Sequence, residues 1–194
     1  MKRSIAKLSL VAGLFAASSL AFAATETYEI DNKHSFANFS IRHVVAKTSG
    51  TFSDVTGKLV IDKENLANSS VEAKINVLSV STSNAKRDEH IKKEEYLNAG
   101  KFGEIHFVST KIAPTSASQG NVTGKLTING VTKEVTFPFA VLGFGNDPWG
   151  GTRTGVEGKT IIRASDFGYT WAAKTGAPVG DDIEVTLLLE GIKK

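Results

Sequence analysis

The side chains best suited to acid–base or metal chemistry in this chain are its four histidines, His34, His43, His90 and His106. No two of them stand at the i, i+2 or i, i+4 spacing that would bring both onto one face of a strand or helix around a metal ion. The sequence contains no cysteine, and its single methionine is Met1. Thiolate catalysis, thiol redox chemistry and sulfur-ligated copper or zinc are therefore excluded, and we expect no metal site.

Motifs of the common catalytic classes are also absent from the sequence: it has no G-x-S-x-G elbow, no H-E-x-x-H and no phosphate-binding loop. Polar chemistry is concentrated in Arg87-Asp88-Glu89-His90, which forms either an ion pair at a helix start or a polar group at the mouth of a cavity. His43 shares a strand face with Phe39 and Ile41, so it is either a hydrogen-bonded core residue or a group that fixes the head of a ligand. We assign no catalytic residue.

The elements that must position these groups are predicted to be strands, because apolar and polar residues alternate along most of the chain from residue 24 onwards. The alternation is clearest in residues 35–44, 71–77, 104–107, 122–128, 134–141, 156–163 and 182–190. Asn129-Gly130 lies between two of these segments and is a strong hairpin signal. With shorter pieces near 27–31 and 51–62, the pattern predicts an all-β fold of about eight antiparallel strands, closed into a barrel or stacked as a sandwich.

One stretch, Ser83 to Gly100, departs from this alternation. It is rich in charged residues, and Ile91 is its only β-branched residue. Ser83 or Asn84 could cap a helix there, and Gly100 could follow the helix end. We predict one short helix near residues 84–97, inserted between strands where it could close one mouth of a barrel.

The first 23 residues have the organisation of a cleavable secretory signal peptide. Lys2, Arg3 and Lys7 precede an apolar run that is too short to span a bilayer, and Ala21-Phe22-Ala23 is a small-x-small cleavage site. These residues contain three of the 23 basic side chains and none of the 20 acidic ones, so residues 24–194 have no net charge. This balance argues against nucleic-acid binding. We expect a single domain, residues 24–194, without a membrane span after cleavage.

Several short motifs occur in a fixed order along residues 24–194. They are Asp31-Asn32-Lys33-His34-Ser35, Phe39-x-Ile41-x-His43, Gly50-Thr51-Phe52, Arg87-Asp88-x-His90, Ile105-x-Phe107-x-Ser109, Gly124-x-Leu126-Thr127-Ile128-x-Gly130-Val131-Thr132-Lys133 and Asp166-Phe167-Gly168. Together they resemble the YceI-like family over essentially this whole range. One departure is Ile91, which follows the Arg-Asp-x-His element where that family usually has leucine.

The resemblance implies an extended, lipocalin-like β-barrel in the periplasm. Members of that family hold a polyisoprenoid or isoprenoid-quinone-like chain in an apolar tunnel, so a binding protein with a transport, storage or stress-related role is implied, and not an enzyme. No cofactor is expected besides the bound lipid or quinone. The predicted lining residues are Phe39, Ile41, Ile75, Val77, Phe107, Leu126, Ile128, Phe137, Phe139, Ile162, Val185 and Leu187. We predict that His43 and Arg87 contact the ligand's head group.

Two other functions stay open at this stage. The chain could be an enzyme that acts on an apolar substrate, with His43 or the Arg87–His90 group as acid–base machinery. It could also be an interaction module for a membrane redox partner. The oligomeric state is equally open, and a homodimer is one alternative.

Overall fold

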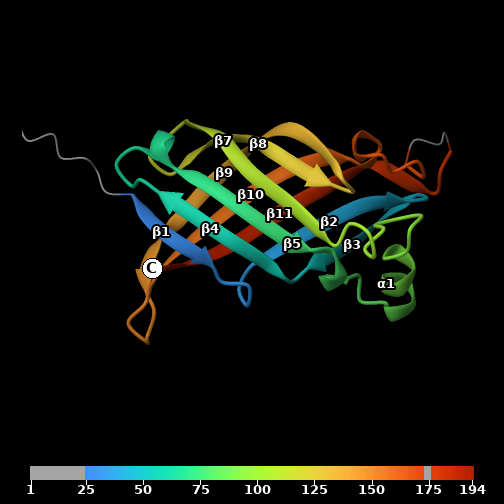
Figure 1. Cartoon of the computed structure of the whole chain (residues 1–194), viewed down its shortest axis with the longest axis horizontal. Coiled ribbons are helices and arrows are strands. Elements are labelled where there is room, and N and C mark those ends of the chain that lie inside the picture. Colours follow the sequence, from blue (N-terminus) through green and yellow to red (C-terminus); the bar gives the residue numbers. More distant parts are fainter. Residues whose placement is uncertain (1–24, 173–175) are drawn as a thin grey trace, which may run out of the picture.

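The computed structural model describes residues 25–172 and 176–194, so the predicted signal peptide, residues 1–23, lies outside the described residues. The described residues form one β-barrel with a short helix at one end (Figure 1). In that part of the chain, no helix is long and apolar enough to cross a membrane. The strands are β1 (Glu26–Ile30), β2 (Phe36–His43), β3 (Ala46–Phe52), β4 (Val55–Ile61), β5 (Ser70–Asn76), β6 (Val80–Ser81), β7 (Glu104–Pro114), β8 (Gln119–Ile128), β9 (Val131–Asn146), β10 (Thr152–Arg163) and β11 (Val179–Lys193).

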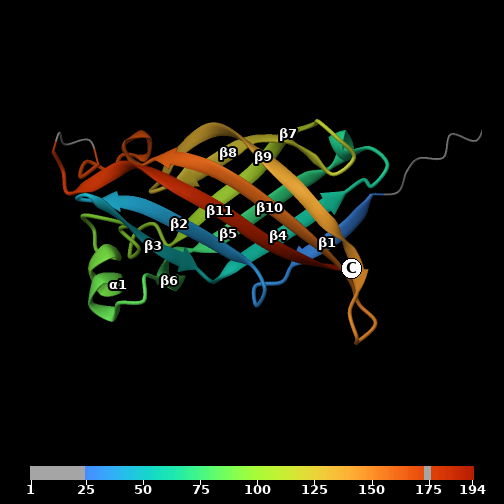
Figure 2. The same cartoon turned by 180° about the vertical axis from the view of Figure 1, so that it is seen from behind.

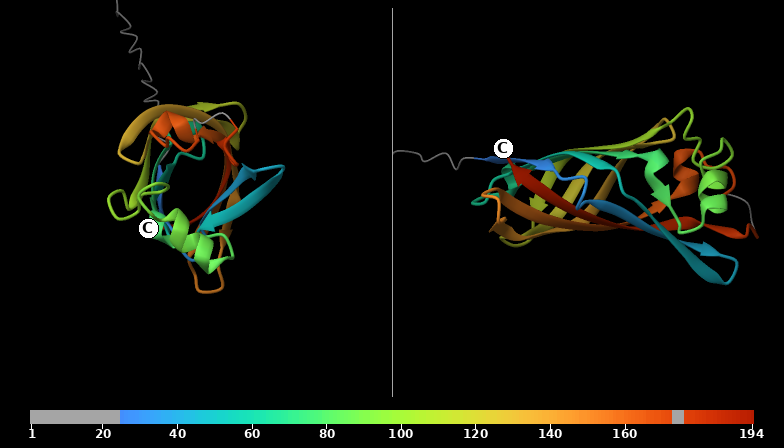
Figure 3. Two further views of the ribbon diagram at one scale, coloured as in Figure 1. Left: turned by 90° about the vertical axis from the view of Figure 1, so that its right-hand side faces the viewer. Right: turned by 90° about the horizontal axis from the view of Figure 1, so that it is seen from below.

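These eleven strands make a closed barrel in which the chain runs along the wall eight times, with neighbouring runs antiparallel. The first three runs are bent and each contains two strands: β1 with β2, β3 with β4, and β5 with β6. β1 and β2 pair with successive parts of β11, and β4 and β3 pair with β1 and β2 in turn. β5 and β6 continue the sheet on β4 and β3, and β7 to β11 follow in chain order. The pairing of β1 and β2 with β11 closes the ring, which Figures 2 and 3 show from behind and end-on. The prediction of a barrel is confirmed, and the sandwich is excluded.

Two glycine positions show how the sequence shapes the barrel wall. Asn129 and Gly130 have φ of 51° and 74°, the two left-handed residues that a tight hairpin between β8 and β9 needs. Gly57 in β4 has φ of 132°, and a Cβ there would lie 2.1 Å from the carbonyl oxygen of Glu72 on β5. Only glycine permits this close approach of the two strands.

The helix α1 (Ala85–Ile91) is shorter than the predicted 84–97. It begins as predicted at Asn84, whose side chain accepts a hydrogen bond from the Arg87 amide at 3.1 Å. After Ile91 the chain runs through turns, and the Leu97 amide donates back to the Ile91 carbonyl at 2.9 Å. A continuous helix would point Tyr96 and Leu97 to different faces, whereas the turns bring both toward the barrel interior.

The ladder between β9 and β10 covers only part of the two strands. It ends at the pair Phe139–Gly158, and Pro138, which has no amide hydrogen to donate, stands next in β9. The short 3-10 helix η3 (Ala164–Phe167) contacts both strands beyond this point, and the Asn129 side chain donates to the Phe167 carbonyl at 3.1 Å. Side-chain packing therefore replaces the backbone ladder in this part of the wall.

The end of the barrel away from α1 is sealed. Tyr28 is fully buried there, and its ring centroid lies 6.0 Å from that of Phe144. The Glu26 carboxylate accepts hydrogen bonds from the Lys193 ammonium and the Tyr28 hydroxyl, both at 2.5 Å, and lies 2.6 Å from the Lys63 ammonium. Lys193 and Lys63 lower the pKa of Glu26 to about 2, so the carboxylate stays charged at this seal.

Candidate ligand-binding cavity

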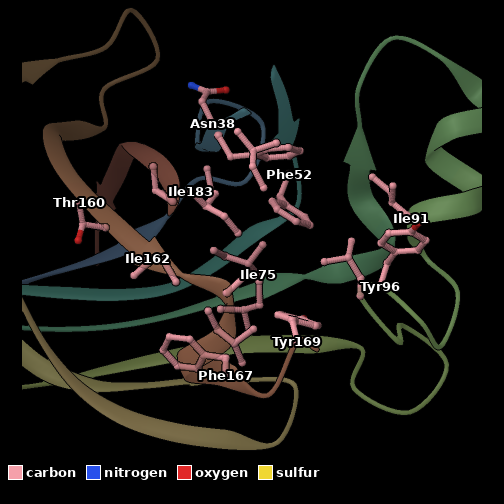
Figure 4. Close-up of a pocket in the computed structure, with 18 of the residues that line it drawn as sticks. Asn38, Phe52, Ile75, Ile91, Tyr96, Thr160, Ile162, Phe167, Tyr169 and Ile183 are labelled. Atoms are coloured by element: carbon pink, nitrogen blue, oxygen red, sulfur yellow. The ribbon is translucent and has the colours of Figure 1, made fainter. Parts of the chain in front are cut away.

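The interior of the barrel holds an apolar cavity of about 340 Å³ on the side of α1 (Figure 4). Its volume falls in the range of about 300–1,000 Å³ that is typical of small-molecule sites. Inward-facing residues of nearly every strand contribute to it, since alternate side chains of each strand point to one face. Figure 4 shows Phe52, Ile75, Ile162 and Ile183 converging on this space from different strands.

Most of the residues predicted to line a tunnel do line this cavity. They are Phe39, Ile41, His43, Ile75, Arg87, Phe107, Leu126, Ile128, Phe137, Ile162, Val185 and Leu187. Strand alternation predicted the inward facing of those that lie in strands, whereas Arg87 lies in the helix α1 and was predicted as a head-group contact. Their contact with a ligand stays a prediction.

Two predicted lining residues, Val77 and Phe139, lie elsewhere. β5 ends at Asn76, and Val77 begins the 3-10 helix η2 (Val77–Ser79), so it leaves the alternation and packs, 3% exposed, in the core. Phe139 faces a second, smaller cavity of about 70 Å³ farther from α1. The sequence pattern correctly predicts that Phe139 points into the barrel. It does not predict how far along the barrel axis the side chain lies.

Sequence reasoning missed the aromatic rim of the cavity. Tyr96, Tyr169 and Trp171 lie together, with ring centroids 6.1 Å apart for Tyr96–Trp171 and 5.7 Å apart for Tyr169–Trp171. Burial raises the pKa of Tyr169 to about 12, so its phenol is neutral. These residues come from turns after α1 and after η3, where no periodicity marks an inner face. The two-residue spacing of Tyr169 and Trp171 is the one signal that could have indicated a shared side.

The polar groups of the Arg87 element meet through Thr82. Arg87 Nε donates to the Thr82 hydroxyl at 2.7 Å and Nη2 donates to the Thr82 carbonyl at 2.8 Å. The Thr82 hydroxyl in turn donates to Asp88 Oδ1 at 2.5 Å and lowers the pKa of that carboxyl. Arg87 is thus fixed on the cavity lining by a shared hydroxyl and not by a direct ion pair.

The histidines of interest take different positions. His43 is the last residue of β2, is exposed, and lines the cavity at its outer edge, so the alternative of a core histidine is excluded, while its contact with a head group stays a prediction. His90 packs against Tyr96 with centroids 4.8 Å apart, and the described residues on the cavity lining do not include it. Arg87 and His43 are the basic side chains on that described lining.

One polar atom of the aromatic rim is unusual. Among the described residues, the indole nitrogen of Trp171 is the buried side-chain donor that has no hydrogen-bond partner. An unpaired buried donor costs about 1–3 kcal/mol. Since Trp171 lines the cavity, a hydrogen-bond acceptor on a bound molecule could remove this cost.

A second polar cluster lies outside the cavity and brings Asp31, His34 and Glu190 within 4.8 Å of one another. Arg153 already supplies a cation there: Nη1 donates to Asp31 at 2.8 Å and to Glu190 at 2.5 Å, and Nε donates to Asp147 at 2.8 Å. The hydrogen bond from His34, with that from Arg153, lowers the pKa of Asp31 to about 2. Through Arg153, the cluster therefore connects the turn after β1 and the loop between β9 and β10 to β11. It gives no reason to place a metal there.

Comparison with known proteins shows which family the chain matches. Residues 28–191 match the model of the YceI-like domain. A UPF0312 protein of Ectopseudomonas mendocina is 38% identical over 197 residues, and Protein YceI of Salmonella arizonae is 35% identical over 195 residues; each alignment covers all of both chains.

Solved structures share the fold. Burkholderia cenocepacia BcnA aligns with a TM-score of 0.73 at 25% identity, over 83% of this chain and 98% of that one. A polyisoprenoid-binding domain of Saccharophagus degradans aligns with a TM-score of 0.66 at 16% identity, over 86% of this chain and 98% of that one. The match to the family model covers most of the described barrel, and this chain belongs to the YceI-like family.

Proposed function

Starting from this membership, we propose that the chain is a binding protein that carries a long apolar isoprenoid-type lipid, either a polyprenyl or an isoprenoid-quinone-like chain. The observation that carries the proposal is a cavity of about 340 Å³ whose wall is hydrocarbon, with Arg87, His43 and Trp171 at its α1 end. An extended apolar tail fits such a wall, while a polar head group needs partners only at the mouth.

The energetics support this ligand class. Burial of apolar surface is worth roughly 25 cal/mol per Å², so each methylene of a chain adds about 0.8 kcal/mol without any directional contact. A branched polyisoprenoid contacts branched and aromatic side chains such as Ile75, Ile162 and Phe39 closely. The Saccharophagus degradans domain, which shares the fold, is described as polyisoprenoid-binding.

The head group would meet Arg87 and the indole nitrogen of Trp171, which has no hydrogen-bond partner among the described residues. Both are hydrogen-bond donors, so they suit a quinone carbonyl, a hydroxyl or a phosphate. His43 at the outer edge would meet the same group when the ligand enters or leaves. The signal-like N-terminal sequence supports a periplasmic location for this carrier.

Catalysis on the bound chain is less well supported. No carboxylate stands among the described residues that line the cavity, and His43 lies at its outer edge. Substitution of His43→Gln and His90→Gln separates the two functions: a carrier keeps its bound lipid, whereas an enzyme loses turnover.

Purification from the native host, followed by organic extraction and mass spectrometry, tests the proposal. We expect one class of isoprenoid lipid to accompany the protein. The Ala73→Phe variant, which places a ring in the cavity, should lose it, and Ala140→Phe on the half-exposed outer face should keep it. The absence of any lipid from the wild-type protein, together with no uptake of added isoprenoid, would contradict the proposal.

A further inference from the structure

The barrel interior is divided along its length. The larger cavity opens near α1, and the smaller one of about 70 Å³ lies toward the sealed end, among side chains such as Leu59, Ile112 and Val122. Three side chains line both: Phe107, Phe137 and Leu187. They therefore stand between the two spaces.

These three side chains come from three alternate strands, β7, β9 and β11, so they reach the barrel axis from different sides. The rings of Phe107 and Phe137 have centroids 5.4 Å apart at an interplanar angle of 50°, a favourable tilted contact. Both residues are less than a tenth exposed. Together, Phe107, Phe137 and Leu187 make a partition across the interior.

Glycines make room for the partition on the neighbouring strands. A Cβ at Gly124 on β8 would lie 2.5 Å from Cζ of Phe107, and a Cβ at Gly158 on β10 would lie 3.3 Å from Cε2 of Phe137. Any other residue at position 124 would displace the Phe107 ring, because real side chains do not approach so closely. The sequence thus provides the space in which these rings sit.

The space behind the partition has the same chemistry as the space in front. The inner cavity is lined mainly by aliphatic and aromatic side chains, and the fully buried Tyr28 packs beside it in the core. Apolar cavities of this kind stay dry and bind hydrocarbon. Its walls therefore suit the far end of an apolar chain. The partition lies between this space and the larger cavity.

From this arrangement, and resting on the function proposed above, we propose that Phe107, Phe137 and Leu187 set the length of the isoprenoid that the barrel accepts. The inner cavity is then a tail-end subsite, which a chain bound in the larger cavity enters when the Phe137 ring moves aside. A short chain ends at the partition. A longer chain must displace the ring from its contact with Phe107, so additional isoprene units add little affinity in the wild-type protein.

Binding of linear isoprenoid alcohols of increasing length, namely farnesol, geranylgeraniol and solanesol, tests this inference. The readout is the fluorescence of Trp171 in a Trp149→Phe background, since the chain has only two tryptophans. For the protein with the wild-type partition, the affinity for these alcohols should stop rising once the chain is long enough to reach the partition. Phe137→Ala should raise the affinity for the longest bound alcohol by about tenfold or more relative to the shortest, because even two further buried methylenes are worth that factor.

Phe139→Ala is the matched control, since it removes the same ring from the inner cavity alone and leaves the partition intact. In this variant, the affinity should depend on the length of the alcohol as it does in the wild-type protein (the length profile). Val156→Phe, which fills the inner cavity, should cancel the gain of Phe137→Ala. If Phe137→Ala does not fold, as judged by circular dichroism, Phe137→Val takes its place.

Identical length profiles in the wild-type and Phe137 variants would overturn the partition while leaving lipid binding intact. A gain in Phe139→Ala equal to that in Phe137→Ala would overturn it too. If the wild-type protein binds none of the three alcohols, the proposed function itself fails.

Discussion

Trp171 is the side chain at which the empty and the occupied barrel should differ most. Its indole nitrogen is buried without a partner among the described residues. Removal of an unpaired donor is close to neutral for folding, whereas removal of a donor used by a ligand weakens binding. Trp171→Phe should therefore leave the thermal midpoint of the ligand-free protein unchanged or slightly raised.

The same substitution should weaken binding of an isoprenoid with a polar head, and it should not affect a bare hydrocarbon of equal length. Isothermal titration or competition with a fluorescent fatty probe measures both. A loss of several degrees in the midpoint of the ligand-free protein would show that the indole nitrogen has a structural partner, contrary to this account.

At the scale of elements, the hairpin between β2 and β3 is built on an unfavourable turn. Its two central residues are Val44 and Val45, which are 54% and 96% exposed, and Val44 has φ of 52°. A β-branched residue in the left-handed region costs about 1–2 kcal/mol, and a two-residue hairpin loop with positive φ only at its first central residue favours Gly there. The Arg42 side chain donates to the Val44 carbonyl at 3.0 Å, and the Val44 amide donates to the Pro178 carbonyl at 2.6 Å.

Exchange of this turn for Gly-Asn should stabilise the barrel, because Val44 has a positive φ and Val45 does not. We expect Val44→Gly with Val45→Asn to raise the free energy of unfolding in urea by about 1 kcal/mol. Val45→Thr alone, at a fully exposed position without positive φ, should change it little. A double variant less stable than the wild type would mean that the valine side chains make contacts that outweigh the strain.

The Arg153 cluster connects three elements: the turn after β1, the loop between β9 and β10, and β11. The pKa of Asp31 is about 2 in the folded protein, below the value of about 3.9 in an unfolded chain. Because the folded state has the lower pKa, the stabilisation is complete above about pH 4 and is lost as the pH falls toward 2.

Arg153→Gln should therefore lower the thermal midpoint at pH 7, and the gap to the wild type should narrow as the pH is lowered from about 4 toward 2. Arg163→Gln is the control, since Arg163 is 63% exposed and meets Asp181 only at 3.4 Å. A gap that stays constant over this pH range would show that Arg153 stabilises the loops by packing alone.

The elements also show what the sequence could predict. Alternation indicated the strands and most inner-facing residues, such as Ile75 and Val185, because one wall of each strand faces a continuous interior. It failed where the chain leaves a strand: Val77 begins a 3-10 turn, and Tyr96 and Tyr169 reach the cavity from turns without a period. The bending of single passes at β1–β2, β3–β4 and β5–β6 depends on contacts between distant strands, which one sequence does not display.

The molecule as a whole is a tube with one sealed and one accessible end. Glu26, Lys193 and Lys63 hold the sealed end with charges, and the cavity opens at the other, beside α1. The end-on view in Figure 3 shows α1 at the rim of that end of the ring. For the proposed lipid, we expect entry beside α1 with the head group outermost, where Arg87 and His43 line the cavity.

A fluorescence titration of the Trp149→Phe protein with geranylgeraniol tests whether this cavity binds an isoprenoid chain. Trp171 is then the only tryptophan, and it lines the cavity. We predict a saturable change in its emission at one ligand per barrel, absent in Ala73→Phe and retained in Ala140→Phe, with all proteins equally folded. No saturable change, or an equal response from the Ala73→Phe protein, would contradict the claim.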